Sequence, residues 1–188
     1  TAADIALLQS LGVPGAGDLT NFRFYVNDFD TTTEGFDVVA TYETEIGNGN
    51  TSFTFVYSDV ETEVDRTGGL IGSGRIDQLE KLLPGKRWNL SAVHNTGDWR
   101  MLARMNWVDE WFTEEWGGGG GYISDMSTID LEVSRDIGDY TLTLGAQNAF
   151  DDYPDKEKRG LILGWEYPEA SPLGFNGAFY YFKVGLDF

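Results

Sequence analysis

The chain has 188 residues and no cysteine, which excludes a disulfide framework, a thiolate metal site and a thiol nucleophile. Its 13 basic and 31 acidic residues give a net charge of -18, which argues against nucleic-acid binding because phosphate contacts need clustered lysine and arginine. The 24 glycines, 6 tryptophans, 9 tyrosines and 12 phenylalanines predict an all-β protein with many turns.

The first part of the chain contains one loop and one long extended stretch. Residues 1–18 hold a short apolar run that glycines and Pro14 end, which predicts a loop with a single helical turn. Residues 20–44 place apolar side chains at even positions on both sides of a polar centre. This pattern predicts one long strand with a bulge or bend near residues 30–35, and two strands joined by a tight turn is the alternative.

The middle of the chain alternates turns and strands. A turn at residues 46–50 leads into a strand that carries Phe53, Phe55 and Tyr57 on one side. A long polar link follows at residues 65–85, in which residues 76–83 predict a short helix. The next strand spans residues 87–95 and ends in a turn at residues 96–98.

Residues 99–112 give the clearest strand prediction. One face carries Trp99, Met101, Ala103, Met105 and Trp107, and the other carries Arg100, Arg104 and Asn106. Trp99 and Trp107 lie eight residues apart, which matches the two interfaces of a roughly 25 Å apolar membrane band. These five apolar residues are therefore expected to face a membrane.

Three strands are predicted in the remainder. A glycine-rich loop at residues 114–125 leads to strands at residues 126–135 and 140–147, joined by a turn at residues 136–139. A long link at residues 151–175 precedes the closing strand, residues 176–188, whose even positions from Ala178 to Phe188 are all apolar. Short turns thus alternate with long links, which is the asymmetry of outer-membrane barrels, whose periplasmic turns are short and extracellular loops long. The count is seven strands, or eight if the first is split.

Three stretches resemble the C-terminal part of the barrel of TonB-dependent outer-membrane receptors. They are DFDTTTEGFDVVATYE at residues 28–43, LGAQNAFDDYPD at residues 144–155 and GFNGAFYYFKVGLDF at residues 174–188. The resemblance implies an antiparallel transmembrane β-barrel of 22 strands, filled by a plug. It also implies uptake of a siderophore, cobalamin, haem or an oligosaccharide, driven through the TonB protein.

The resemblance assigns residues 1–19 to an extracellular loop segment and residues 20–188 to about seven C-terminal barrel strands. Neither a plug nor a TonB box is recognisable, so we expect a fragment or one part of a larger assembly, in the outer membrane of a Gram-negative bacterium. The expected partners are the plug and N-terminal strands, TonB through that missing part, outer-membrane lipid and an extracellular small-molecule substrate. Phe188 occupies the place of the family's assembly signal. A small closed outer-membrane barrel and a soluble carbohydrate-binding β-sandwich are the alternatives.

Catalytic and metal-binding patterns are weak, so we expect neither an enzyme, a cofactor nor a metal. His94 is the one histidine and has no recognisable triad around it. The acidic residues at 109, 110, 114 and 115 offer oxygen ligands for calcium but lack calcium-loop spacing, which favours a solvated acidic loop. Asp130 and Glu132 are expected to form cross-strand ion pairs with Arg100 and Arg104.

Aromatic residues in the long loops are the nearest approach to a binding site. Aromatic rings stack on sugars and other flat ligands and commonly line ligand sites. The candidate ligand-binding residues are Trp111, Trp116, Tyr122, Tyr153, Trp165 and Tyr167.

Overall fold

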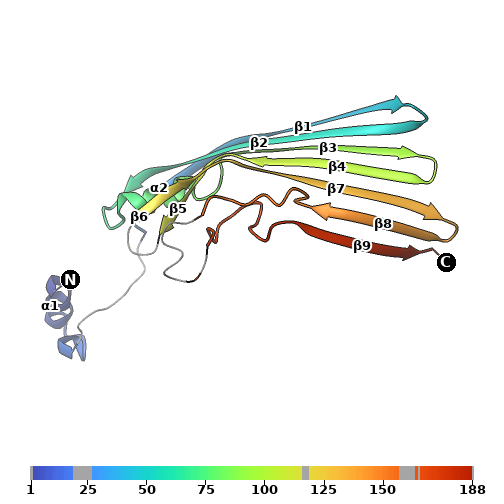
Figure 1. Cartoon of the computed structure of the whole chain (residues 1–188). Helices are drawn as coiled ribbons and strands as arrows, with labels where there is room; N and C mark the ends of the chain where they lie inside the picture. The colour runs from blue at the N-terminus through green and yellow to red at the C-terminus, as the bar shows by residue number, and fades with distance from the viewer. Residues whose placement is uncertain (1, 19–26, 116–118, 157–163, 165, 188) are drawn as a thin grey trace.

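A computed structural model describes residues 2–18, 27–115, 119–156, 164 and 166–187. Seven antiparallel strands form one sheet in the order β1-β2-β3-β4-β7-β8-β9 (Figure 1). The strands are β1 (Phe29–Ile46), β2 (Gly49–Thr67), β3 (Lys86–Thr96), β4 (Trp99–Val108), β7 (Met126–Ile137), β8 (Tyr140–Gln147) and β9 (Phe179–Leu186). The number of strands in this sheet agrees with the seven predicted from the sequence.

The other elements are helices and a small hairpin. They are α1 (Ala2–Ser10), the 3-10 helix η1 (Ala16–Asp18), α2 (Ser73–Lys81), β5 (Trp111–Glu115) and β6 (Gly119–Ile123), of which β5 and β6 form a separate two-stranded sheet. Figure 1 shows α2 and the β5–β6 hairpin at one end of the main sheet, and the tight turns at the other. Neither α-helix in the described residues has the length and apolar content that crossing a bilayer requires.

Three two-residue turns close the hairpins β1–β2, β3–β4 and β7–β8. Each turn begins with a glycine at positive φ, namely Gly47, Gly97 and Gly138. Tight hairpins favour such residues because their backbone twist requires positive φ. We call this end of the strands the turn end. The opposite end of the strands, where the long links lie with α2 and the β5–β6 hairpin, is the loop end.

β1 is one continuous strand over its described length. It pairs with β2 from Phe29 to Ile46, with a register shift between Asp30 and Thr31. A bulge inserts one unpaired residue into a strand, so the predicted bend near this position corresponds to an interrupted ladder and not to a turn. The apolar positions before residue 27 lie outside the described residues.

The strand register places apolar side chains on one face of the sheet. A single row crosses six strands through Phe53, Ala92, Ala103, Leu131, Ala146 and Tyr180. We call this side the apolar face and the opposite side, which carries Arg100, Arg104 and Glu132, the polar face. The apolar face is largely uncovered in the described structure. Its large apolar side chains include Leu90, Met105, Leu144 and Phe182, all of which are exposed.

The buried apolar core is small and lies at the loop end. Val108, Trp111, Ile123 and Met126 form it, with Leu173 packed against them. A soluble domain of this size ordinarily removes most of its large apolar side chains from water. This sheet does not bury them by itself.

Several expectations need correction. The predicted strand at residues 99–112 ends at Val108, and Trp111 begins β5, because the chain leaves the main sheet at Asp109 and Glu110. The glycine-rich segment predicted as a loop contributes β6, whose backbone pairs with β5. The segment predicted to hold one helical turn contains α1, which is nine residues long.

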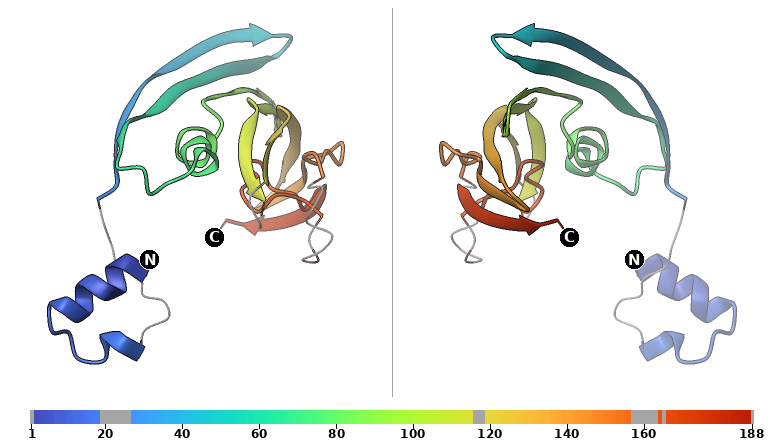
Figure 2. Two further views of the ribbon diagram at one scale, coloured as in Figure 1. Left: turned by 90° about the vertical axis from the view of Figure 1, so that its left-hand side faces the viewer. Right: turned by 90° about the vertical axis from the view of Figure 1, so that its right-hand side faces the viewer.

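The described strands form neither a small closed barrel nor a β-sandwich, the two alternative architectures. β1 and β9 are the two edges of the main sheet and do not pair with each other, so these strands do not close a small barrel (Figure 2). The second sheet holds only β5 and β6, so it does not cover the main sheet as in a sandwich. The curved, open sheet is consistent with a segment of a larger barrel wall.

Candidate functional site: two sheet faces and an aromatic loop end

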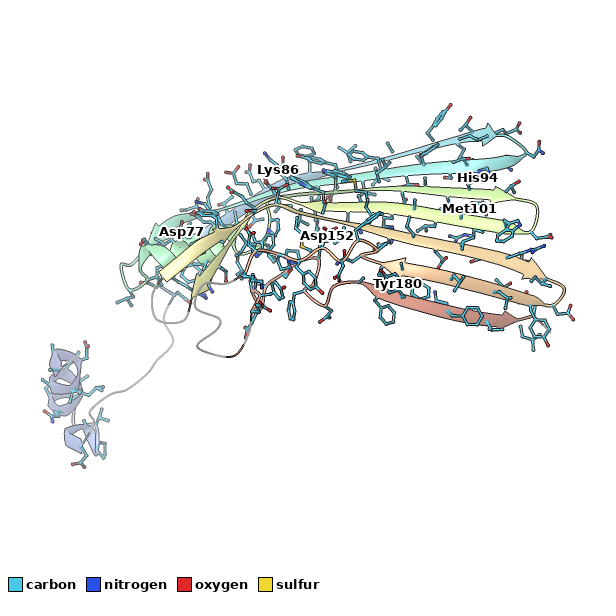
Figure 3. The ribbon with its side chains drawn as sticks, viewed as in Figure 1. Asp77, Lys86, His94, Met101, Asp152 and Tyr180 are labelled. Carbon is cyan, nitrogen blue, oxygen red and sulfur yellow. The ribbon has the colours of Figure 1, made fainter. Side chains whose placement is uncertain are left out.

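The five residues predicted to face a membrane share the apolar face. Trp99, Met101 and Met105 are 40%, 41% and 37% exposed. Ala103 is exposed as well, and Trp107 is half-buried. Figure 3 shows the side chains on this sheet, with His94 and Met101 side by side on β3 and β4.

Aromatic residues mark the loop end of the apolar face. The Trp88 and Trp107 rings stack with centroids 6.1 Å apart, and Phe55 lies 6.3 Å from Trp88. At the turn end, the Arg135 guanidinium lies over the Trp99 ring, 4.9 Å from its centroid. Trp99 and Trp107 are eight residues apart, a separation of about 27 Å along a strand. The apolar face thus has an aromatic margin at each end.

His94 lies on the apolar face, where it pairs with Thr51 on β2 and Met101 on β4. Its Nδ1 forms a hydrogen bond of 2.8 Å with the Thr51 hydroxyl on β2. Thr51 is buried, so this bond satisfies two polar groups on an otherwise apolar surface. A structural role therefore accounts for His94.

Glu132 is the centre of the polar face. Its carboxylate accepts hydrogen bonds from Arg100 at 2.9 Å and from the Tyr181 hydroxyl at 2.8 Å, and it lies 3.5 Å from the Lys183 ammonium. The predicted ion pair between Arg100 and Glu132 is confirmed. The contacts from β9 were not predicted, because they cross the intervening strand β8.

Asp130 accepts hydrogen bonds from uncharged groups in place of the predicted ion pair. It lies opposite Arg104 in the strand register, yet its carboxylate accepts hydrogen bonds from the Asn106 amide at 3.1 Å and the Asn148 backbone N–H at 3.0 Å. Asp130 therefore fastens the end of β8 to β7.

Two of the candidate ligand-binding aromatics meet in the last long link. The Tyr153 and Tyr167 rings stack with centroids 5.2 Å apart, and Phe175 extends the stack 6.5 Å from Tyr167. Phe175 was not among the predicted residues, because nothing in its local sequence distinguishes it from the neighbouring closing strand.

The remaining candidates have different environments. Tyr122 is half exposed, packs edge-on against Phe112 and accepts a hydrogen bond of 3.0 Å from the Lys81 ammonium. Trp111 is fully buried, so its ring is not available to a ligand in this structure, and its Nε1 has no hydrogen-bond partner within the described part of the chain. Trp116, Trp165 and Phe188 lie outside the described residues.

The loop-end polar contacts shift three ionisable groups. The hydrogen bond that Lys81 donates to the Tyr122 hydroxyl raises the pKa of Lys81, and the hydrogen bond that Tyr153 donates to Asp151 raises the pKa of Tyr153. Hydrogen bonds from Ser124 hold the pKa of Asp155 below its ordinary value of 3.8. The backbone N–H of Ser124 lies 3.0 Å from the Asp155 carboxylate, which ties the last long link to the segment between β6 and β7.

The motif Asn-x-Phe-Asp-x-Tyr at residues 148–153, which lies in the second of the three stretches that resemble receptor strands, anchors the closing strand. Asp151 accepts hydrogen bonds from the Ala178 backbone N–H at 2.8 Å and from the Tyr153 hydroxyl at 3.0 Å. Asn148 and Asp151 both adopt positive φ, 47° and 63°, so the chain reverses sharply after β8. The sequence showed the motif but not this role, which depends on contacts with residues far along the chain.

No group of three or more histidine or acidic residues positioned to hold a metal ion occurs among the described residues. The side chains of two of the acidic residues considered for calcium, at positions 114 and 115, lie outside that description.

Comparison with known proteins identifies a fold. No protein-family model matches the chain, and comparison with curated proteins found no match. Among solved structures, the chain is similar to the FrpB iron transporter from Neisseria meningitidis (F3-3 variant), with a TM-score of 0.55 and 12% sequence identity over 85% of this chain. The matched region is 24% of that transporter, so the chain spans about a quarter of its length. At this identity the similarity shows the fold alone.

Proposed function

We propose that the chain is a C-terminal barrel segment of a TonB-dependent uptake receptor in the outer membrane of a Gram-negative bacterium. The observation that carries the proposal is the apolar face, which stays exposed across seven strands and lies opposite a polar face that carries the charge network of Glu132, Arg100 and Lys183. Alternation of apolar and polar faces with aromatic margins is the pattern of a barrel wall between lipid and an aqueous lumen.

The energetics of the apolar face favour lipid over water. A continuous apolar surface of this kind is unfavourable in water and is normally covered by a partner or a membrane. No second protein layer covers the apolar face in the described structure. Acyl chains of a membrane would cover it instead. The polar face, with Glu132, Arg100 and Lys183, would line the lumen.

Orientation follows from the connections. The turn end would lie in the periplasm and the loop end, with α2 and the β5–β6 hairpin, outside the cell, because barrels of this class carry short periplasmic turns. The resemblance of residues 144–155 and 174–188 to receptor strands supports the same direction, with β9 running toward the periplasm.

The open edges of the sheet support the proposal that further strands pair with it. Unpaired backbone groups in lipid are strongly unfavourable, so β1 and β9 would pair with further strands of a 22-stranded barrel. Those strands, a plug and the contact with TonB would come from the rest of the receptor. The transported substrate would be a siderophore, cobalamin, haem or an oligosaccharide, with Tyr153 and Tyr167 among its contacts at the loop end. Similarity to a transporter fits a function other than catalysis.

Solubility tests the proposal. The full chain is diluted from urea into buffer alone and into the same buffer with phospholipid vesicles or detergent micelles. We expect dispersed, β-rich protein only when lipid or detergent is present, because the apolar face must be covered. A monomeric chain that unfolds cooperatively in buffer alone would contradict a membrane location.

A further inference from the structure

Arg135 is a cation on the apolar face. It lies on β7 two residues before the end of the strand and opposite Trp99 and Leu142 in the register. Its guanidinium packs over the Trp99 ring. Among the residues that the structure describes, Arg135 forms no ion pair, although the chain has a net charge of -18.

The nearest acidic side chains do not use this guanidinium. Asp136 accepts a hydrogen bond from the Thr141 hydroxyl on the polar face, because neighbouring residues of a strand point to opposite sides. Asp98 and Asp139 lie in the turns. Arg135 therefore offers unpaired N–H donors at the margin of an apolar surface.

A hollow in the apolar face begins at Val133, two residues farther from the turns than Arg135 on the same strand. It is a wide, open hollow with a volume of about 870 Å³. Its lining includes Ala92, Ala103, Ala146, Met101, Leu144 and Phe182. Small alanines in neighbouring strands leave the hollow, and larger side chains border it.

A guanidinium at one end of an apolar hollow matches an amphiphile with an anionic head and an apolar tail. Arginine binds phosphate through paired N–H donors, and a planar guanidinium stacked on an aromatic ring keeps those donors oriented. An acyl chain that lies in the hollow contacts the protein in place of neighbouring lipids. Basic positions at a membrane surface attract anionic head groups for the same electrostatic reason.

We propose that this surface is a phospholipid site, in which Arg135 binds the head-group phosphate and the hollow around Ala103 binds an acyl chain. The inference rests on the proposed membrane location, which places the apolar face in lipid. The bound lipid would belong to the leaflet at the turn end.

The test is lipid binding to the full chain in detergent micelles, measured by native mass spectrometry. The probes are phosphatidylglycerol and a diacylglycerol with the same acyl chains, so that they differ in the head group. We expect the native chain to bind phosphatidylglycerol about tenfold more tightly, since hydrogen bonds to charged groups are of that strength. Equal binding of the two lipids would overturn the proposal.

Variants separate the two parts of the site. Arg135→Gln should abolish the preference for phosphatidylglycerol, and Ala103→Phe should weaken binding of both lipids by filling the hollow. Arg104→Gln is the matched control, because it removes the same charge from the polar face and should bind as the native chain does. A preference that survives Arg135→Gln would overturn the head-group contact.

Different results would overturn the phospholipid site and the proposed function. Loss of the lipid preference in a chain that still requires micelles would overturn the phospholipid site alone. A chain that is monomeric and folded in buffer without detergent would overturn both.

Discussion

Tyr181 on β9 donates a hydrogen bond to Glu132 on β7 across the full width of β8, with 2.8 Å between the two oxygens. The residue of β8 between them is Gly145, which pairs with both Glu132 and Tyr181. A Cβ at position 145 would overlap the Tyr181 ring. The absence of a side chain at this one position lets β9 reach the charge network on β7.

Gly145→Ala should therefore destabilise the sheet. The added methyl group displaces Tyr181, and the loss of a hydrogen bond to a charged group costs about 1.5 to 3 kcal/mol. Gly185→Ala in β9 is the matched control, because a Cβ there would lie 3.6 Å from Thr141, an ordinary contact. The free energy of unfolding in urea, measured in vesicles, gives the comparison. Equal values for the two variants would show that Gly145 does not admit Tyr181.

Asp151→Ala should loosen the start of β9. The variant removes the acceptor for the Ala178 N–H and the Tyr153 hydroxyl, and leaves both donors without their partner. Asp152→Ala removes the same charge one residue later, where only the backbone contacts Asn148. Amide hydrogen exchange of β9 should accelerate in the first variant and stay unchanged in the second. Unchanged exchange in both would remove the anchoring role of the motif.

Thr51→Val should destabilise the apolar face near His94. Valine has nearly the shape of threonine but cannot bond to the imidazole, so His94 keeps an unsatisfied nitrogen, at a cost of about 1 to 3 kcal/mol. Thr54→Val is the control, since the Thr54 hydroxyl forms no hydrogen bond within the described structure. Thermal unfolding in micelles should show a lower midpoint for Thr51→Val only.

Asp155 should make the loop end sensitive to acid. Its folded-state pKa lies below the ordinary value of 3.8, so its contribution to stability is present above that value and is lost as the pH falls through the folded-state pKa. Asp155→Asn should thus be less stable than the native chain at neutral pH, and the difference should shrink below pH 3.8. Unfolding midpoints recorded from neutral to acidic pH check this. A difference that grows on acidification would contradict the sign of the shift.

Local alternation explains why most of the main sheet was predictable. Whether a side chain lies on one face depends on the strand period of two, which the residues from Trp99 to Trp107 show without reference to the rest of the chain. The turns at Gly47, Gly97 and Gly138 were equally local, because a two-residue hairpin loop needs positive φ.

The missed features depend on contacts between distant segments. Trp111 continues the apolar parity of β4, so the sequence does not reveal that the chain leaves the sheet and buries this ring in a cluster with Ile123 and Met126. Glycines weaken a strand, and Gly119–Ile123 becomes one only because β5 supplies hydrogen-bond partners. The Tyr181–Glu132 contact required knowing that Gly145 stands between them.

The central claim is that the apolar face contacts lipid, and one pair of arginine substitutions on β4 tests it. Met105→Arg places a charge on the apolar face, and Leu102→Arg places the same charge on the polar face beside its register partner Glu132. The measurement is the free energy of unfolding in phospholipid vesicles. If the apolar face contacts lipid, Met105→Arg should cost about 2 to 4 kcal/mol and Leu102→Arg much less. A negligible loss for Met105→Arg, or a larger loss for Leu102→Arg, would contradict it.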